Sequence, residues 1–547
     1  MTSPASGAPS EASSGLIRST GVITLATGCS RILGFIRDLL IARLFGTALQ
    51  AQAFVVAFRL PNMLRELVAE GAVTSAFVPV LSRYRAQGRL DEFWAVGQAL
   101  LAQLLIVLCV IGAAGVVWAP QIVRVIAPGF ADDPEKFALT VRLTRLLFPL
   151  IVLVGLWAYF MGVLNSLRHF AVPALGPAIL NVAMIAALIW WVPGTEPGSV
   201  APHALRAGLP SPTPLHGVPG SVALAVGILI GGVIQVLVQL PVAAKLGFRF
   251  RLRLRHPGTG DMLRLLGPRT VAAAVYQVNI LVHTALASWE AAVGAGAVAA
   301  LYFANRLVQL PLALFGTASA QASLPSLAEQ AARGDWEGFR TTLLRVIRMA
   351  AFLIVPAAAA LIALGGPIIR GLFERGAFDA HSTAMTVSAL AWYAVGLPAY
   401  AVAKAMTGAY YAMHDTRTPL RLAAEAVGVN ILLSLGLMWP MAIGGLALAS
   451  SLANVLNAYR LSREMERRLR APLLPGLAAS MSRMAAAAAL MAAGCWGLWS
   501  AAGFDAHPWL GLAAVIPAGA GMYALGCRAA GVSELTSLLR WLRRRPA

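Results

Sequence analysis

Arginines inside apolar segments are the residues of this sequence whose type and spacing could do chemistry. Residues 26–46 are apolar and long enough to cross a membrane, yet they include Arg31, Arg37, Asp38 and Arg43. An arginine at the centre of a bilayer is unfavourable by about 2.5–3.5 kcal/mol on insertion scales, and ionisable residues within spans usually face a cavity on a substrate path. Guanidinium groups stay charged and match phosphate in shape. Several such arginines therefore predict an anion site, for phosphate or pyrophosphate.

The spacing of these residues predicts how they face. Arg31 and Asp38 are seven residues apart and share one stripe of a helix, whereas Arg37 points about 120° away. This span therefore needs either a wide polar surface or a partner for Arg37 within the same helix. In the next apolar segment Pro61 precedes Arg65 by one turn and predicts a kink beside a cavity or another helix. The ionisable residues within the predicted spans are Arg31, Arg37, Asp38, Arg59, Arg65, Glu66, Glu70, Arg142, Arg145, Arg269, Arg306, Lys404 and Glu425.

Some of these charges have a structural explanation that stays open beside the anion site. Arg142, Arg145 and Arg269 lie near the starts of spans, where long side chains can reach the headgroup layer. Glu66 and Glu70 stack one turn apart and could form ion pairs with the arginine beside them.

The elements that must position these residues are membrane helices. The chain has 547 residues, 59% of them hydrophobic and 12% charged, with a mean hydropathy of +0.73. This composition excludes a water-soluble domain and predicts an all-α polytopic membrane protein. Fourteen candidate spans can be read, the eleventh and twelfth starting near residues 420 and 443. The first 15 residues lack the basic start and cleavage site of a signal peptide, so the first helix is expected to be retained.

The net charge of +20 is explained by topology rather than by nucleic acid. Basic residues gather in alternate connections between the spans, such as 83–89, 245–255 and 460–470, and the other connections are nearly free of them. By the positive-inside rule both termini are expected in the cytoplasm. The four cysteines are far apart and show no zinc-binding or disulfide spacing, so no metal site or cofactor is predicted.

An internal repeat sets the expected architecture. At an offset of 246 residues Pro79 meets Pro325, Gly162 meets Gly408, and further prolines, glycines and an arginine coincide. The offset covers six spans, so the halves keep one orientation, and the transport path is expected at the interface between such halves. The predicted domains are a disordered tail (1–18), an N-lobe of six spans (19–245), a basic cytoplasmic linker (246–261), a C-lobe of six spans (262–470), two extra helices (471–530) and a basic cytoplasmic tail (531–547).

Several motifs resemble a known family. They are "SRILGFIRD" (30–38), "VAFRLPNMLRELVAEGAVTSAFVPVL" (56–81), "APGF" (127–130), "GVLNSLRHFAVPALGPAILN" (162–181), "YFANRLVQLP" (302–311), "LPSL" (324–327) and "DTRTP" (415–419). The chain is similar in these stretches to the MurJ/MviN lipid II flippases. The resemblance covers about 21–470 and implies a fold of fourteen helices, arranged as two six-helix lobes and two extra helices.

The resemblance also implies a site. The arginines that are essential in the family's cavity correspond to Arg31, Arg37, Arg65 and Arg306, and the motif positions Ser30, Asp38 and Glu70 belong with them. The chain departs from the family pattern at Gln52, Asn305 and Gln309, where many or some members have an acidic residue. A sodium site is therefore not carried over, and a dependence on membrane potential or a coupling ion stays open.

The resemblance implies a flippase that moves lipid II, the undecaprenyl-pyrophosphate-linked disaccharide-pentapeptide, to the outer leaflet of the bacterial inner membrane for peptidoglycan synthesis. Expected partners are lipid II, membrane lipids and cell-wall synthesis proteins, without nucleic acid. The alternatives are another lipid-linked oligosaccharide flippase, a multidrug antiporter of the same superfamily, an intramembrane glycosyltransferase with Asp132, Asp133 and Glu135 as its candidate acids, or a scaffold. A drug antiporter is expected to have carboxylates in its cavity, and a scaffold needs no charged cavity.

Overall fold

Helices form every regular element in the part of the chain that the structure describes. The computed structural model describes residues 11–66, 77–192, 219–260 and 277–543. Ten helical segments within these ranges are long and apolar enough to cross a membrane. The predicted all-α membrane fold is confirmed. The count of fourteen spans stays a prediction.

The chain divides into two compact units. Unit 1 comprises residues 1–45 and 49–277, and unit 2 comprises residues 46–48 and 278–547. The predicted lobe and linker boundaries stay a prediction. The first helix already begins at Glu11, within the segment that the sequence analysis assigns to the tail.

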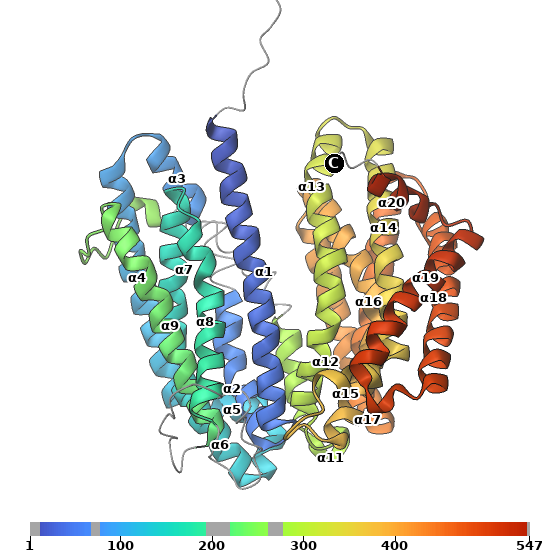
Figure 1. The fold of residues 1–547 in the computed structure, drawn as a ribbon. Helices are drawn as coiled ribbons and strands as arrows, with labels where there is room; N and C mark the ends of the chain where they lie inside the picture. The colour runs from blue at the N-terminus through green and yellow to red at the C-terminus, as the bar shows by residue number, and fades with distance from the viewer. Residues whose placement is uncertain (1–10, 67–76, 193–218, 261–276, 544–547) are drawn as a thin grey trace, which may run out of the picture. The chain divides into compact units, whose positions relative to one another are not determined.

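Unit 1 is built from long helices packed lengthwise, with α1 against α8 and α8 against α9 (Figure 1). Two short helices, α5 and α6, lie at the opposite end of this unit from α3. The elements are α1 (Glu11–Phe45), α2 (Leu49–Arg65), α3 (Val78–Ala86), α4 (Leu90–Val117), α5 (Ala119–Ile126), the 3-10 helix η2 (Pro128–Asp132), α6 (Pro134–Leu147), α7 (Leu150–Ser166), α8 (Ala171–Trp190) and α9 (Gly220–Lys245).

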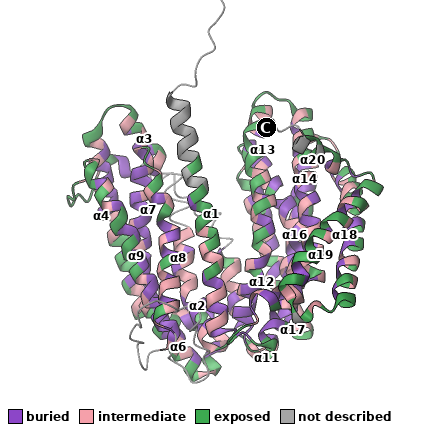
Figure 2. Cartoon of the chain, viewed as in Figure 1, coloured by how far each residue is buried: buried purple, intermediate pink, exposed green. Residues whose placement is uncertain are grey.

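A buried tyrosine joins two helices of unit 1. Tyr159 of α7 is fully buried and donates a hydrogen bond of 2.9 Å to the backbone oxygen of Gly97 in α4. A Cβ at Gly97 would lie 3.1 Å from that hydroxyl, so glycine allows the close approach. Outside this core, Ile106, Val107 and Val110 of α4 are exposed (Figure 2). A large apolar surface of this kind fits contact with lipid.

Unit 2 includes the short helix Gln277–Ala287, apart from Gln277 itself, which belongs to unit 1. A bundle follows, in which α16 packs against α12, α14 and α17. Its further elements are α11 (Glu290–Val293), α12 (Ala297–Pro311), the π-helical segment η4 (Leu312–Thr317), α13 (Ala318–Ala332), α14 (Trp336–Ala363), α15 (Gly365–Leu372), α16 (Ala380–Ala412), α17 (Arg417–Leu469), α18 (Leu474–Ala502), the 3-10 helix η5 (Phe504–Ala506), α19 (Pro508–Ala529) and α20 (Ser533–Arg543).

The 53-residue helix α17 is in fact a hairpin of two helices. The backbone at Ala442 leaves the helical region, with φ 48° and ψ −133°, and the chain reverses there. Glu425 before the turn forms an ion pair with Arg460 after it, and Arg468 reaches Asp415 at 2.6 Å. The turn lies where the eleventh and twelfth predicted spans meet.

Candidate functional site

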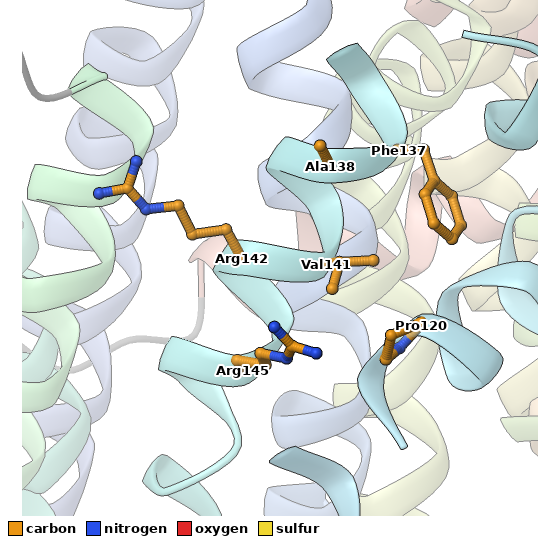
Figure 3. Close-up of a pocket in the computed structure, with 6 residues that line it drawn as sticks. All are labelled: Pro120, Phe137, Ala138, Val141, Arg142 and Arg145. Carbon is orange, nitrogen blue, oxygen red and sulfur yellow. The ribbon is translucent and has the colours of Figure 1, made fainter. Parts of the chain in front are cut away.

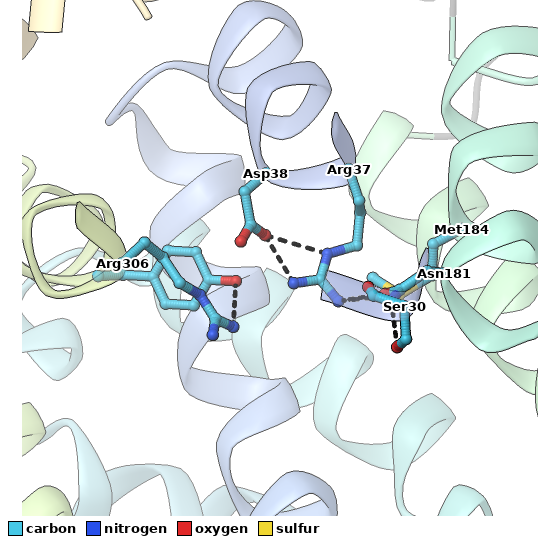
Figure 4. A network of polar contacts seen from close by, with 7 residues as sticks. Ser30, Arg37, Asp38, Asn181, Met184 and Arg306 are labelled. Carbon is cyan, nitrogen blue, oxygen red and sulfur yellow. Dashed lines mark hydrogen bonds and ion pairs between the residues drawn. The ribbon is translucent and has the colours of Figure 1, made fainter. Parts of the chain in front are cut away.

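A buried polar network joins α1 to α8 in unit 1 (Figure 4). Nε and Nη2 of Arg37 donate to Oδ1 of Asp38 at 3.0 and 2.7 Å. Nη1 of Arg37 donates to Oδ1 of Asn181 at 2.8 Å, and Nδ2 of Asn181 donates to the backbone oxygen of Ser30 at 3.0 Å. The side chains of Arg37 and Asp38 are 11% and 4% exposed. Each residue of the network thus supplies a hydrogen-bond partner to another, in a segment where water is scarce.

Within α1 the structure pairs Asp38 with Arg37 rather than placing it beside Arg31. The seven-residue spacing predicted a face shared by Asp38 and Arg31. An intrahelical partner for Arg37 was the other arrangement expected from sequence, and the structure shows Asp38 as that partner. Arg31 is exposed, and no hydrogen bond or ion pair of its side chain is found among the described residues. Its guanidinium is therefore available to an outside anion, whereas the charge of Arg37 is already neutralised.

The polar residues of α2 form a second group in unit 1. Nε of Arg65 donates to Oδ1 of Asn62 at 3.2 Å. The carboxylate of Glu66 accepts from Asn62 at 3.0 Å and from Gln277 at 2.9 Å. The carboxylate of Glu66 is thus held by amide groups, and not by the ion pair that was the structural alternative expected from sequence. Glu70 and Arg269 lie outside the described residues.

Arg306 is the predicted site residue of unit 2. It lies one turn after Tyr302 on α12, donates to the tyrosine hydroxyl at 3.0 Å and has its guanidinium carbon 4.8 Å from the ring centroid. Next to Tyr302, Phe303 is fully buried and packs on Phe373 and Phe378, with ring centroids 5.4 and 5.6 Å away. This aromatic cluster fixes the rotation of α12 and hence the direction of Arg306.

The three positions that depart from the family pattern differ in burial. Gln52 of α2 is 2% exposed, while Asn305 and Gln309 of α12 are exposed. An amide at the buried position brings no charge, so the structure can accommodate it without the burial of an ion.

A polar cluster in unit 2 was missed by the sequence analysis. Nδ2 of Asn430 in α17 donates to Oδ1 of Asn279 and to Nε2 of His283, both at 2.7 Å. The hydroxyl of Ser450 lies 3.2 Å from the same Nε2. The cluster as a whole joins helix Gln277–Ala287 to both arms of α17.

The cluster of unit 2 matches the network of unit 1 in position. Asn181 and Ser30 are 151 residues apart, as are Asn430 and Asn279, and each residue of the second pair lies 249 positions after its counterpart. A chain that had been duplicated would retain such a crosslink. The signal in the sequence is an asparagine within an otherwise apolar helix, which carries no charge and is therefore less conspicuous than an arginine.

The chemistry of these groups is that of binding. Arg31, Arg65 and Arg306 present guanidinium groups that suit phosphate, and the described residues include no set of three His, Cys, Asp or Glu side chains that could hold a metal ion.

The fold is that of a multi-pass helical membrane protein, because ten of the described helical segments are long and apolar enough to span a membrane. Charged side chains such as Arg306 lie within them. A family model described as lipid II flippase MurJ matches residues 41–507. The chain belongs to this family. It is accordingly a transporter and not an enzyme.

Named relatives match over most of their length. The chain is 38% identical to a probable lipid II flippase MurJ of Rhizobium tropici, over 81% of this chain and 79% of the relative. It is 35% identical to the lipid II flippase MurJ of Burkholderia cenocepacia, over 91% and 92%.

Solved structures support the fold. A lipid II flippase MurJ in an inward closed conformation aligns with a TM-score of 0.73 at 24% identity, over 92% of this chain and 97% of that one. An inward-facing MATE multidrug transporter aligns with a TM-score of 0.64 at 15% identity, over 81% and 94%. At these identities the likeness is one of fold.

Proposed function

We propose that this protein moves lipid II from the inner to the outer leaflet of the bacterial inner membrane, for peptidoglycan synthesis. The observation that carries the proposal is the family match over residues 41–507. It includes two of the four arginines, Arg65 and Arg306, and the carboxyl end of α1, the helix that carries the other two. Both relatives described above are named lipid II flippases.

The proposed mechanism is alternating access. Arg31, Arg37, Arg65 and Arg306 bind the pyrophosphate in an arginine-lined central cavity, with Ser30, Asp38 and Glu70 as supporting residues, and the lipid tail stays in the membrane. Opening to the other side then releases the headgroup to the outer leaflet. An inside-negative potential favours outward movement of an anion, by about 2.3 kcal/mol per charge per 100 mV. Both termini are placed in the cytoplasm, and no cofactor is required.

The contacts of the arginines suggest different roles within this mechanism. Arg31 has no side-chain partner among the described residues and is proposed to make the first contact with the pyrophosphate. Arg37 is held by Asp38 and Asn181, so it would have to exchange a partner before it could bind an anion. Loss of Arg31 is therefore expected to weaken capture, while loss of Arg37 also disturbs the packing of α1 on α8.

The test is the exposure of lipid II at the outer leaflet in cells depleted of their own flippase. The wild type, Arg31→Ala and Arg306→Ala are compared at equal expression, with Arg333→Ala as the control because Arg333 is an exposed residue paired with Glu329. We expect exposure with the wild type and the control, and its loss in the two site variants. No exposure with folded wild-type protein would contradict the proposal and favour another lipid-linked cargo or a drug. Exposure that survives both site substitutions would refute the arginine site alone.

A further inference from the structure

A pocket of about 370 Å³ lies between α5 and α6 of unit 1, away from the network of α1 (Figure 3). Its walls are mainly apolar, and its polar lining comes from two arginines one turn apart on α6. The lining residues are Pro120, Phe137, Ala138, Val141, Arg142 and Arg145. This volume is within the range of small-molecule sites in proteins.

The two arginines of the pocket have no partner in the described part of the chain. Arg142 and Arg145 are exposed and take part in no hydrogen bond or ion pair there. Residues three apart on a helix are neighbours, so the two like charges repel each other, and Figure 3 shows the two guanidinium groups extending in opposite directions. Nearby, the guanidinium of Arg124 lies 5.6 Å from the ring centroid of Phe137 and fixes that wall. An anion between Arg142 and Arg145 would relieve the repulsion.

The carboxylates of α6 do not meet this need. Asp133 caps the helix by accepting from the backbone N–H groups of Glu135 and Lys136, and it lies 3.9 Å from the Lys136 ammonium. From Glu135 to Arg142 the helix rises by about 10 Å, at about 1.5 Å per residue. Asp133 and Glu135 are therefore at a different level of the helix from Arg142 and Arg145.

The depth of the pocket indicates a headgroup. The segment Pro134–Ser166 is helical nearly throughout and apolar enough to span a membrane. From Ser166 to Arg145 it rises by about 31 Å at about 1.5 Å per residue, and the hydrocarbon core is about 30 Å thick. If Ser166 marks one edge of that core, Arg145 lies at the other, level with lipid phosphates. The sequence analysis explained Arg142 and Arg145 by side chains that reach the headgroup layer. That explanation accounts for the depth of the two arginines but not for the pocket beside them.

We propose that this pocket binds the phosphate of a lipid, with Arg142 and Arg145 on the phosphate and the apolar walls of Pro120, Phe137 and Val141 against the first carbons of the chain. Guanidinium groups match phosphate oxygens, and apolar walls favour a phosphate that has a hydrocarbon attached. With the termini in the cytoplasm the site faces the outer leaflet, although binding to the isolated protein does not depend on that orientation.

The experiment measures ligand binding to the full-length, delipidated protein by native mass spectrometry. The probes are dioleoyl phosphatidic acid, dioleoylglycerol, which lacks the phosphate, and inorganic phosphate, which lacks the lipid. The site variant is Arg142→Gln/Arg145→Gln. The control is Arg417→Gln/Arg483→Gln, because these arginines are also exposed and the charge change is the same. We expect the dissociation constant of the most tightly bound phosphatidic acid molecule to rise at least tenfold in the site variant and less than twofold in the control.

Each other outcome is decisive. Equal affinity of the wild type and the site variant, or an equal loss in the control, would overturn the proposal. Inorganic phosphate bound as tightly as phosphatidic acid would overturn the lipid assignment and make the free anion the ligand. Dioleoylglycerol bound as tightly would overturn the role of the arginines. Should the site variant fail to fold, Ala138→Trp keeps every charge and fills the pocket, and an unchanged affinity of that variant for phosphatidic acid would also overturn the proposal.

Discussion

Replacing Asp38 by asparagine tests whether the α1 network is held by charge. The substitution keeps the size of the side chain and removes its negative charge. It leaves Arg37, whose side chain is 11% exposed, as a buried cation that donates to Asn181 and to the sulfur of Met184 without the carboxylate. The chemical change is thus confined to one buried ion pair.

The expected loss can be estimated from burial. Breaking a buried ion pair by removal of one partner typically lowers the free energy of unfolding by about 3–5 kcal/mol, because an uncompensated charge stays behind. Asn181 still binds the guanidinium, so we expect about 3 kcal/mol for Asp38→Asn. Arg37→Gln/Asp38→Asn leaves no buried charge and should lose less than the sum of the single variants, with a coupling energy of about 1–3 kcal/mol.

The assay is a double-mutant cycle on the free energy of unfolding, measured by steric trapping in bicelles. Glu329→Gln serves as a control, because the Glu329–Arg333 pair has side chains that are 60% and 73% exposed and exposed pairs contribute about 0–1 kcal/mol. If the losses of the two single variants add to within about 0.5 kcal/mol, or if Asp38→Asn and Glu329→Gln lose the same amount, the reasoning from burial is refuted.

Two further predictions concern unit 2. Gly445→Ala should lower the free energy of unfolding by about 1–3 kcal/mol, because its Cβ would lie 2.1 Å from the backbone oxygen of Leu437. In the same denaturation assay the control Gly436→Ala should be neutral or slightly stabilising, because a Cβ there meets no atom within 4 Å. Burial tends to raise the pKa of Asp415, but hydrogen bonds from Thr418 and a neighbouring arginine outweigh it and hold the pKa below its usual value. The wild type should therefore be more stable than Asp415→Asn above about pH 4 and lose this advantage as the pH falls through the lower pKa; an advantage that grows on acidification would contradict the assignment.

Membrane class, helical fold and family follow from the sequence because they depend on local and additive properties. Apolar length defines a span by itself, and the meeting point of two predicted spans near residue 443 coincides with the turn at Ala442. The arginines of α1 were found for a similar reason: a charge is conspicuous wherever twenty apolar residues surround it.

The partners of these charges could not be predicted in the same way. Asn181 is 144 residues from Arg37, and only the packing of α8 on α1 brings them together. Helical periodicity groups residues by the directions of their Cβ atoms, so it placed Asp38 on the stripe of Arg31. It takes no account of how far the side chain of Arg37 can reach toward a neighbouring carboxylate. The pocket of α6 was also hidden, since its walls come from two separate helices.

The asparagines of the two units show why the charges are distributed unevenly. A carboxamide donates and accepts at once, so Asn181 can accept from the guanidinium of Arg37 while Asn430 donates to the imidazole of His283. Inside a membrane either arrangement satisfies groups that water cannot reach. The asparagines at corresponding positions of the two units thus form crosslinks with different partners. In unit 1 the crosslink includes the Arg37–Asp38 ion pair, whereas the predicted cation of unit 2, Arg306, lies on another helix. In the proposed mechanism a substrate anion therefore competes with Asp38 for Arg37, whereas the guanidinium of Arg306 donates to the hydroxyl of Tyr302.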